Sequence, residues 1–186
     1  MKRLFVIALA SLMALSAGAQ KIGRVNFNEL VMLMPEMDSA RETISASQKE
    51  AEETYSAMVE EYQGKLSQYQ QKNASWTAAI KESKEKELID IQNRIQEFQQ
   101  NITQELQQQQ AQLMAPINEK ANKAVKEIAK AKGLTALFDA SQAIYFDDEA
   151  VVDITADARK ALSIPEGRTV ESLQAELAAK EQPQQK

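Results

Sequence analysis

The sequence contains no cysteine and no histidine. Disulfide bonds, thiolate nucleophiles, imidazole bases and the usual zinc ligands are therefore excluded. It also lacks the glycine-rich loop that commonly holds nucleotide phosphates. We expect no catalytic residue, no metal site and no cofactor. An enzyme, such as a hydrolase that uses serine or carboxylates, is the weakest functional hypothesis.

Aromatic residues, glycine and proline are also scarce: the chain has 5% aromatic residues, 5 glycines and 4 prolines. Between Pro35 and Gly133, only Gly64 and Pro116 interrupt a segment rich in Gln, Glu, Lys and Ala. This composition is typical of long helices and coiled coils. It predicts two long helices that fold back on each other.

The one long apolar run lies at the N-terminus. Residues 4–15 follow the positive charges of Lys2 and Arg3, are too few to span a bilayer, and precede small residues that end at Ala19. We expect residues 1–19 to be a signal peptide that is cleaved near Ala19 and Gln20. Because no cysteine is available to carry a bacterial lipid anchor, we expect the exported chain to be soluble.

Basic residues are in the minority. The chain has 22 Lys and Arg against 27 Asp and Glu, and loss of Lys2 and Arg3 with the signal peptide would leave 20 against 27, a net charge of −7. A binder of nucleic acid is expected to carry a basic surface. The acidic mature chain therefore argues against nucleic acid as a partner.

Helical periodicity supports the two long helices. In the first, Tyr55, Tyr62, Tyr69 and Trp76 lie seven residues apart, which marks one stripe of a helix that needs a partner. The second carries its own series at steps of three and four, made of Leu88, Ile91, Ile95, Phe98 and Ile102. The polar residues 73–75 predict the turn, with Ser75 or Thr77 as the cap of the returning helix. This turn places Tyr62 near Ile89 and Tyr55 near Ile95 or Gln96.

Short β-like segments flank the helices. Residues 22–28 alternate weakly with period two and contain β-branched and aromatic residues, which predicts a strand. Residues 134–139 and 143–146 are two apolar runs that predict a β-hairpin. A helix capped by Asp153 or Thr155 should follow and end near residue 162, and residues 169–180 predict one more helix.

These elements predict an α+β fold that is predominantly helical. We expect residues 20–35 and 117–165 to form a small β-rich body, residues 36–116 to form a long antiparallel helical-hairpin arm, and residues 166–186 to be a partly disordered C-terminal extension. A body of roughly 60 residues is only marginally able to bury its own core. A three-stranded sheet also leaves open edges. We therefore expect subunits to share the sheet through the apolar side chains of Val25, Phe27, Leu137, Phe138, Ile144 and Phe146.

Four short motifs in the body carry a family resemblance. They are KIGRVN at residues 21–26, LFDA at residues 137–140, AIY at residues 143–145 and DITAD at residues 153–157. In this order, with the export signal and the helical hairpin, they resemble the Skp/OmpH family of periplasmic chaperones. The resemblance implies a homotrimer with a central barrel, three arms around a cavity, and ATP-independent holding of unfolded outer-membrane proteins in the periplasm.

A chaperone without a nucleotide must hold its client, the unfolded chain that it protects, by many weak apolar contacts. Methionine and tyrosine suit this role because one is flexible and the other combines an apolar ring with a polar tip. The candidate client-binding residues are Met58, Val59, Tyr62, Leu66, Tyr69 and Trp76. For the tyrosine series, packing between the two arm helices is the stronger interpretation. Trp76 differs from the tyrosines because it lies at the expected tip, where the partner helix has ended. As a large exposed aromatic, it is a better candidate for client contact than they are.

An exported structural coiled-coil scaffold or spacer, without client-holding activity, is the alternative function. It would need the same helices but no cavity. The resemblance also has a limit, because better-known members of the family have basic arms, whereas residues 36–115 here carry more acidic than basic residues. The lipopolysaccharide-binding role proposed for the family is therefore not transferred to this chain, and contact with membranes stays open.

Overall fold

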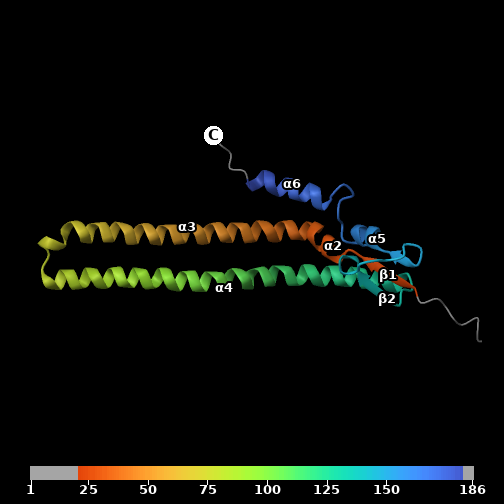
Figure 1. Cartoon of the computed structure of the whole chain (residues 1–186), viewed down its shortest axis with the longest axis horizontal. Coiled ribbons are helices and arrows are strands. Elements are labelled where there is room, and N and C mark those ends of the chain that lie inside the picture. Colours follow the sequence, from red (N-terminus) through yellow and green to blue (C-terminus); the bar gives the residue numbers. More distant parts are fainter. Residues whose placement is uncertain (1–20, 182–186) are drawn as a thin grey trace, which may run out of the picture. The chain divides into compact units, whose positions relative to one another are not determined.

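The structure is a computed structural model that describes residues 21–181 (Figure 1). The expected signal peptide at residues 1–19 lies outside the described residues. The described chain divides into two compact units. One, which we call the body, consists of residues 21–35 and 118–181. The other, which we call the helical pair, runs from Glu36 to Ile117.

The helical pair is made of two long helices that lie side by side and run in opposite directions (Figure 1). Helix α3 (Pro35–Lys72) begins with a proline, which is tolerated at the first helical position because its missing N–H would have no partner there. The short 3₁₀ turn η1 (Asn73–Ser75) follows, at the predicted place. Helix α4 (Ala78–Ala131) then returns. Of the two predicted caps, Thr77 is the one used, because its Oγ1 accepts from the N–H of Ile80 at 3.4 Å.

Gly133 ends α4, as the sequence predicts. Its φ of 68° lies in the left-handed region, which glycine enters without steric cost. The N–H of Gly133 donates to the carbonyl of Lys130 at 3.0 Å, and the N–H of Leu134 donates to the carbonyl of Ala129 at 2.9 Å. These two bonds form a Schellman motif, which satisfies the last carbonyls of the helix.

The body contains a three-stranded parallel sheet. Strand β1 (Ile22–Val25) lies in the centre, between β2 (Ala136–Asp139) and β3 (Val151–Asp153). Ile22 is opposite Ala136 on one side and opposite Val151 on the other. Parallel strands cannot be joined by a tight turn. Here the connection from β1 to β2 includes both long helices.

The predicted β-hairpin is wrong. Residues 143–146 contain no strand, and the partner of β2 is β1. After β2, the side chain of Asp139 accepts from the N–H of Ser141 at 2.9 Å and starts the 3₁₀ turn η2 (Ala140–Gln142), so the chain leaves the sheet instead of turning back along it. The third strand forms later, at β3.

The first strand is also shorter than predicted, because Asn26 caps a helix. Its Oδ1 accepts from the N–H of Glu29 at 3.2 Å, and its Nδ2 donates to Oε2 of Glu29 at 2.8 Å. This reciprocal pair resembles a capping box and starts α2 (Phe27–Leu33). Phe27, predicted to lie on a strand, is therefore the first residue of a helix.

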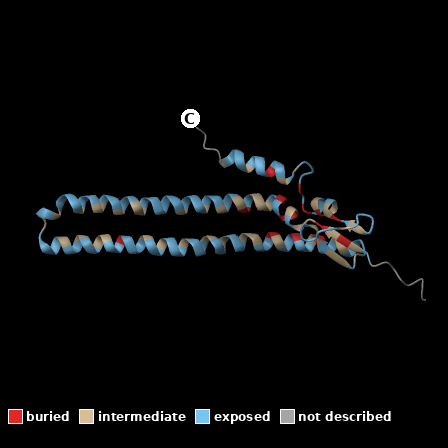
Figure 2. Cartoon of the chain, viewed as in Figure 1, coloured by how far each residue is buried: buried red, intermediate tan, exposed pale blue. Residues whose placement is uncertain are grey.

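The core of the body comes mainly from helices rather than from the sheet (Figure 2). Helix α2 packs against α5 (Thr155–Ala161) and α6 (Val170–Glu181). Burial of one large aliphatic side chain stabilises a fold by about 1.5–3 kcal/mol. The buried hydrophobic residues of the body are Val25, Leu30, Val31, Leu33, Met34, Ala121, Val125, Ile154, Ala158, Leu162, Ile164 and Leu173. The helix predicted for residues 169–180 is thus present as α6 and contributes to the core.

Candidate functional site

The interface between α3 and α4 is held by polar contacts near the turn. Lys65 forms an ion pair with Glu87 on the opposite helix, and Lys84 reaches the same carboxylate at 2.9 Å. Hydrogen bonds from Lys65 and then Lys84 lower the pKa of Glu87 to about 2. Arg94 also crosses the interface, 3.3 Å from Glu61. These charges fix the two helices side by side at this end of the pair.

The two aromatic residues nearest the turn contact each other. The rings of Tyr69 and Trp76 meet edge to face, with centroids 5.8 Å apart and planes at 62°. The Tyr69 hydroxyl donates to Glu85, and this hydrogen bond, with a smaller effect of burial, raises the pKa of Tyr69. Trp76, expected to be an exposed aromatic, is half-buried against Tyr69.

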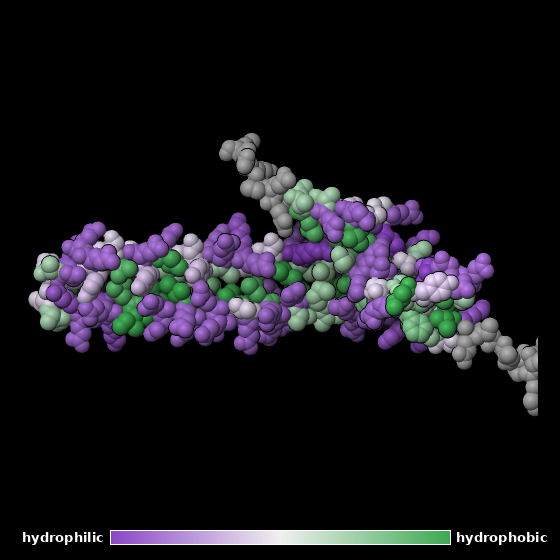
Figure 3. Space-filling view, in the orientation of Figure 1, coloured by the Kyte–Doolittle hydropathy of each residue, from purple (hydrophilic) through white to green (hydrophobic). Residues whose placement is uncertain are grey.

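All of the predicted client-binding residues are half-buried. Five lie on α3 and one follows η1, and the set is Met58, Val59, Tyr62, Leu66, Tyr69 and Trp76. Within the helical pair, the only fully buried residues are Ala40, Ile91 and Ile117. Figure 3 shows apolar side chains between hydrophilic ones along the pair. The pair therefore keeps a long row of apolar groups in partial contact with solvent.

The register of the pair agrees with the sequence prediction near the turn and departs from it farther away. Lys65 meets Glu87, within one residue of the expected partner. Tyr55 instead lines a groove with Phe98 and Gln99, beyond the predicted Ile95 and Gln96. Ser47 accepts from Nε2 of Gln109 at 2.9 Å, more than one helical turn beyond the expected position. A constant register, counted from the turn alone, was the wrong assumption.

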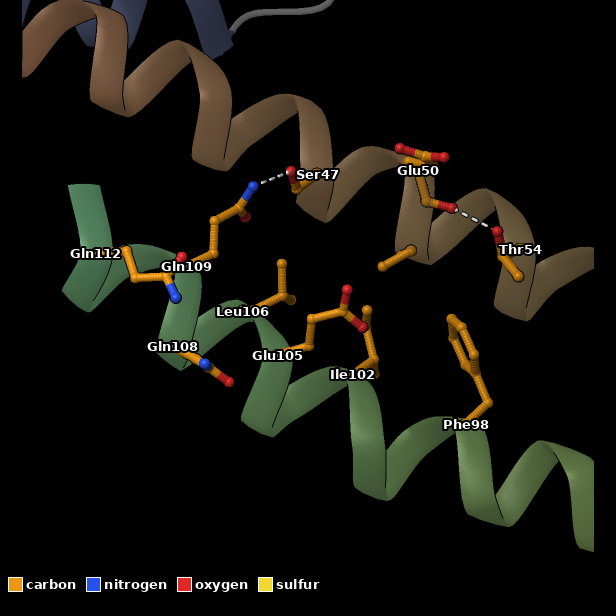
Figure 4. Close-up of a pocket in the computed structure, with 11 residues that line it drawn as sticks. Ser47, Glu50, Thr54, Phe98, Ile102, Glu105, Leu106, Gln108, Gln109 and Gln112 are labelled. Carbon is orange, nitrogen blue, oxygen red and sulfur yellow. Dashed lines mark hydrogen bonds between the residues drawn. The ribbon is translucent and has the colours of Figure 1, made fainter.

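A cleft of about 540 Å³ opens between α3 and α4 beside the Ser47–Gln109 hydrogen bond (Figure 4). From α3 it is lined by small residues, including Ser47, Ala51 and Thr54. A second groove, of about 400 Å³, shares several lining residues with it, which are Ala51, Phe98, Ile102 and Leu106. The prediction of client-binding residues missed this part of α4. The sequence contains small residues on α3 and large apolar residues on α4, but only the register shows that they face each other.

The body carries its own exposed apolar surface beside strand β2. Phe138 is 50% exposed, Tyr145 is 80% exposed and Ile144 is fully exposed. A groove of about 400 Å³ lies there, with Ile22, Phe138 and Phe146 among its lining residues. Of the other predicted oligomerisation residues, Val25 is buried, while Phe27 and Leu137 are half-buried.

The first and last sequence motifs meet in the body through Arg24. Its Nε is 3.0 Å from Asp153, its Nη1 is 2.7 Å from Asp148, and its guanidinium lies over the ring of Phe146 at 5.8 Å. Partial burial raises the pKa of Asp153, but hydrogen bonds from Thr155 and Arg24 outweigh it, so the pKa lies below its usual value. These motifs therefore join β1, β3 and the start of α5.

Comparison with protein families identifies the chain. A family model described as outer membrane protein (OmpH-like) matches residues 21–162. The chain belongs to the OmpH-like family. The resemblance drawn from the sequence motifs is thus confirmed, and the family indicates a periplasmic chaperone kind of function. Members of this family are not enzymes, and neither is this chain.

The match ends at Leu162, so α6 lies beyond the matched residues. No curated protein matches the chain. None of the helices found between residues 21 and 181 has the length and apolar character needed to cross a membrane.

Proposed function

We propose that the chain is an ATP-independent holdase of the periplasm, which binds unfolded outer-membrane proteins and prevents their aggregation. The observation that carries this proposal, beside the family, is the row of half-buried apolar side chains along the helical pair. A half-buried side chain still presents apolar area that a client can cover, and burial of such area is worth about 25 cal/mol per Å². Many small contacts of this kind give binding without one deep pocket.

Release in this proposal needs no nucleotide. Each contact buries little area, so each breaks and forms again quickly, and the client leaves when folding or insertion elsewhere buries more of its surface. Met58, Tyr62 and Tyr69 fit such exchange because their side chains adapt to different partners. The polar contacts near the turn, such as Lys65 with Glu87, hold the helices together while the client changes.

We propose further that the functional unit is a homotrimer assembled through the body. The open outer edge of β2 and the exposed Phe138 and Ile144 support this proposal. An exposed strand edge offers unpaired N–H and C=O groups to another chain. Three helical pairs would then act as arms around one client, and separation of that client from others would prevent strand pairing between them.

The test is suppression of aggregation. A denatured outer-membrane protein is diluted with the mature chain, in the absence of ATP, and light scattering is followed. Protection is expected near an equimolar ratio of client and trimer. It should persist at raised salt, because apolar burial is not screened as charge contacts are. Replacement of Val59, Leu66 and Trp76 together by serine should weaken protection severalfold and leave the oligomer intact.

The matched control is Ala57→Ser, at an exposed position of α3. It should leave protection unchanged. If the unmodified protein gives no protection, or if protection disappears with salt alone, apolar holding is the wrong mechanism. A coiled-coil scaffold without client-holding activity would then be the better description of the chain.

A further inference from the structure

We propose that the cleft between α3 and α4 is a subsite for client segments in which an apolar side chain adjoins a lysine or an arginine. The proposal rests on the holdase function and names the kind of segment that one part of the helical pair selects. It assigns this role to Phe98, Ile102, Leu106, Glu50 and Glu105, which line the cleft.

The apolar floor of the cleft comes from α4. Phe98, Ile102 and Leu106 rise from this helix toward α3 and are half-buried (Figure 4). Opposite them, Ala51 is too small to cover their surface. An apolar side chain that lacks neighbours on one side loses the dispersion contacts it would make there. An apolar group of a client can supply the missing contacts.

Fixed contacts flank the cleft on both sides. A hollow of about 420 Å³ also lies beside Ile91, but polar and charged residues make up the rest of its lining. Toward the turn, the fully buried Ile91 packs in the interface, and ion pairs such as Lys65 with Glu87 connect the helices. On the other side, the hydrogen bond between Ser47 and Gln109 closes the cleft. The stretch between these fixed points is thus held open by the residues around it. Its volume of about 540 Å³ lies within the range of about 300–1,000 Å³ found for small-ligand sites.

The charge of the lining selects the occupant. Glu50 and Glu105 are the charged residues that line the cleft, and no basic residue does. Among residues 21–181, neither carboxylate is engaged in an ion pair. Both carboxylates would attract a lysine or arginine beside the apolar group, and its long aliphatic stem would lie along the apolar floor. The side-chain amides of Gln108 and Gln112 can bond to the backbone of an extended segment.

A second copy of this chain is a poorer occupant than a client. A second helical pair would bring further negative charge to the acidic lining of the cleft, because residues 36–115 carry more acidic than basic residues, whereas a cationic segment is attracted. The cleft also belongs to the helical pair, whereas the sheet edge that we assign to assembly belongs to the body. An unfolded segment of mixed apolar and basic composition therefore fits the observations best.

The experiment measures binding of three fluorescent peptides of equal length to the full mature chain. One alternates leucine with lysine, one leucine with glutamate, and one serine with lysine. The leucine–lysine peptide should bind roughly tenfold more tightly than either other peptide, since two features of the cleft act on it. Protection of a denatured outer-membrane protein by the unmodified chain is measured in parallel, which tests the proposed function separately.

Two variants locate the binding. Ala51→Leu fills the cleft and should weaken binding of the leucine–lysine peptide severalfold. Ala57→Leu adds the same volume on the exposed face of α3 and should leave this binding unchanged. Glu105→Lys should abolish the preference for lysine over glutamate. Glu60→Lys makes the same charge change at an exposed position outside the cleft and should keep most of that preference. Circular dichroism shows whether each variant keeps its helices. If Ala51→Leu unfolds, Glu105→Lys, at an exposed position, still tests whether the peptide binds in the cleft.

Equal binding of the three peptides, or equal effects of each variant and its control, would overturn the proposal. If protection of the denatured protein persists in that case, only the cleft subsite is wrong. If the unmodified chain gives no protection but the cleft variants still change peptide binding, the subsite stands and the holdase function is wrong.

Discussion

At the residue scale, two residues with a left-handed backbone conformation end helices of the body in the same way. Gly133 ends α4 and Ser163, with φ of 57°, follows α5. The N–H of Ser163 donates to the carbonyl of Lys160 at 3.1 Å, and the N–H of Ile164 donates to the carbonyl of Arg159 at 2.9 Å. Both helix ends are Schellman motifs, but only the first has glycine, the residue type that this backbone conformation favours. A serine at such a φ carries a steric cost.

Ser163→Gly should therefore stabilise the body. The relief of steric cost exceeds the extra freedom that glycine gives the unfolded chain, and we expect a gain of about 0.5–1 kcal/mol. At fixed chain concentration, the thermal midpoint should rise by roughly 2–4 °C for each kcal/mol of added stability. The converse change, Gly133→Ala, should lower the midpoint. A lower midpoint for Ser163→Gly would show that the serine does more than occupy the turn.

At the element scale, the sequence predicted what depends on local signals. Helix α3 starts at its proline, the turn lies at residues 73–75, and α4 stops before Gly133, because each boundary is set by the preference of nearby residues. The strands were predicted less well. Residues 143–146 have strong β propensity but lie outside the sheet, whereas β3 has only three residues. Strand choice depends on pairing across long sequence separations, which no local pattern encodes.

The candidate site was also predicted only where it depends on local signals. Seven-residue spacing predicted the half-buried Tyr62 and Tyr69, although Tyr55 of the same series is exposed. The spacing did not predict the cleft, which arises from the size of Ala51 opposite Phe98 and Ile102. The register of α3 against α4 decides which residues face each other, and the turn determines this register only in the first helical turns beside it. Over several turns, small departures from ideal helical periodicity accumulate.

The register can be tested by crosslinking. Ser47→Cys with Gln109→Cys, in a chain that otherwise has no cysteine, should be joined within one chain by a short bifunctional maleimide, because the two native side chains are hydrogen-bonded. The matched pair, Ser47→Cys with Gln104→Cys, has the register predicted from the turn and should react less. Mass spectrometry of the denatured product reads the outcome. A faster reaction of the 47–104 pair would contradict the observed register.

At the scale of the whole molecule, the exposed surface of the body favours the assembly that we propose. The sheet has only three strands, and its outer edges have no partner within residues 21–181. Large apolar groups at one edge stay exposed, although the helical core of the body is well buried. Apolar patches of this kind on a small body usually mark an interaction surface. Helices supply the stability of the body, and the sheet edge remains available for a partner.

The last prediction is that the mature chain is a trimer whose contacts include this edge. Sedimentation of the unmodified protein should give three times the mass of one chain. Phe138→Ser combined with Ile144→Ser should reduce the oligomer to monomers at micromolar concentration while leaving the helical content unchanged, because both side chains are exposed in the single chain and are not part of its core. The control is Ile89→Ser, which removes a large exposed apolar side chain from α4 and should leave the trimer intact. A monomeric unmodified chain, or a double variant that still sediments as a trimer, would mean that assembly uses neither Phe138 nor Ile144, and that the exposed edge of β2 serves another partner.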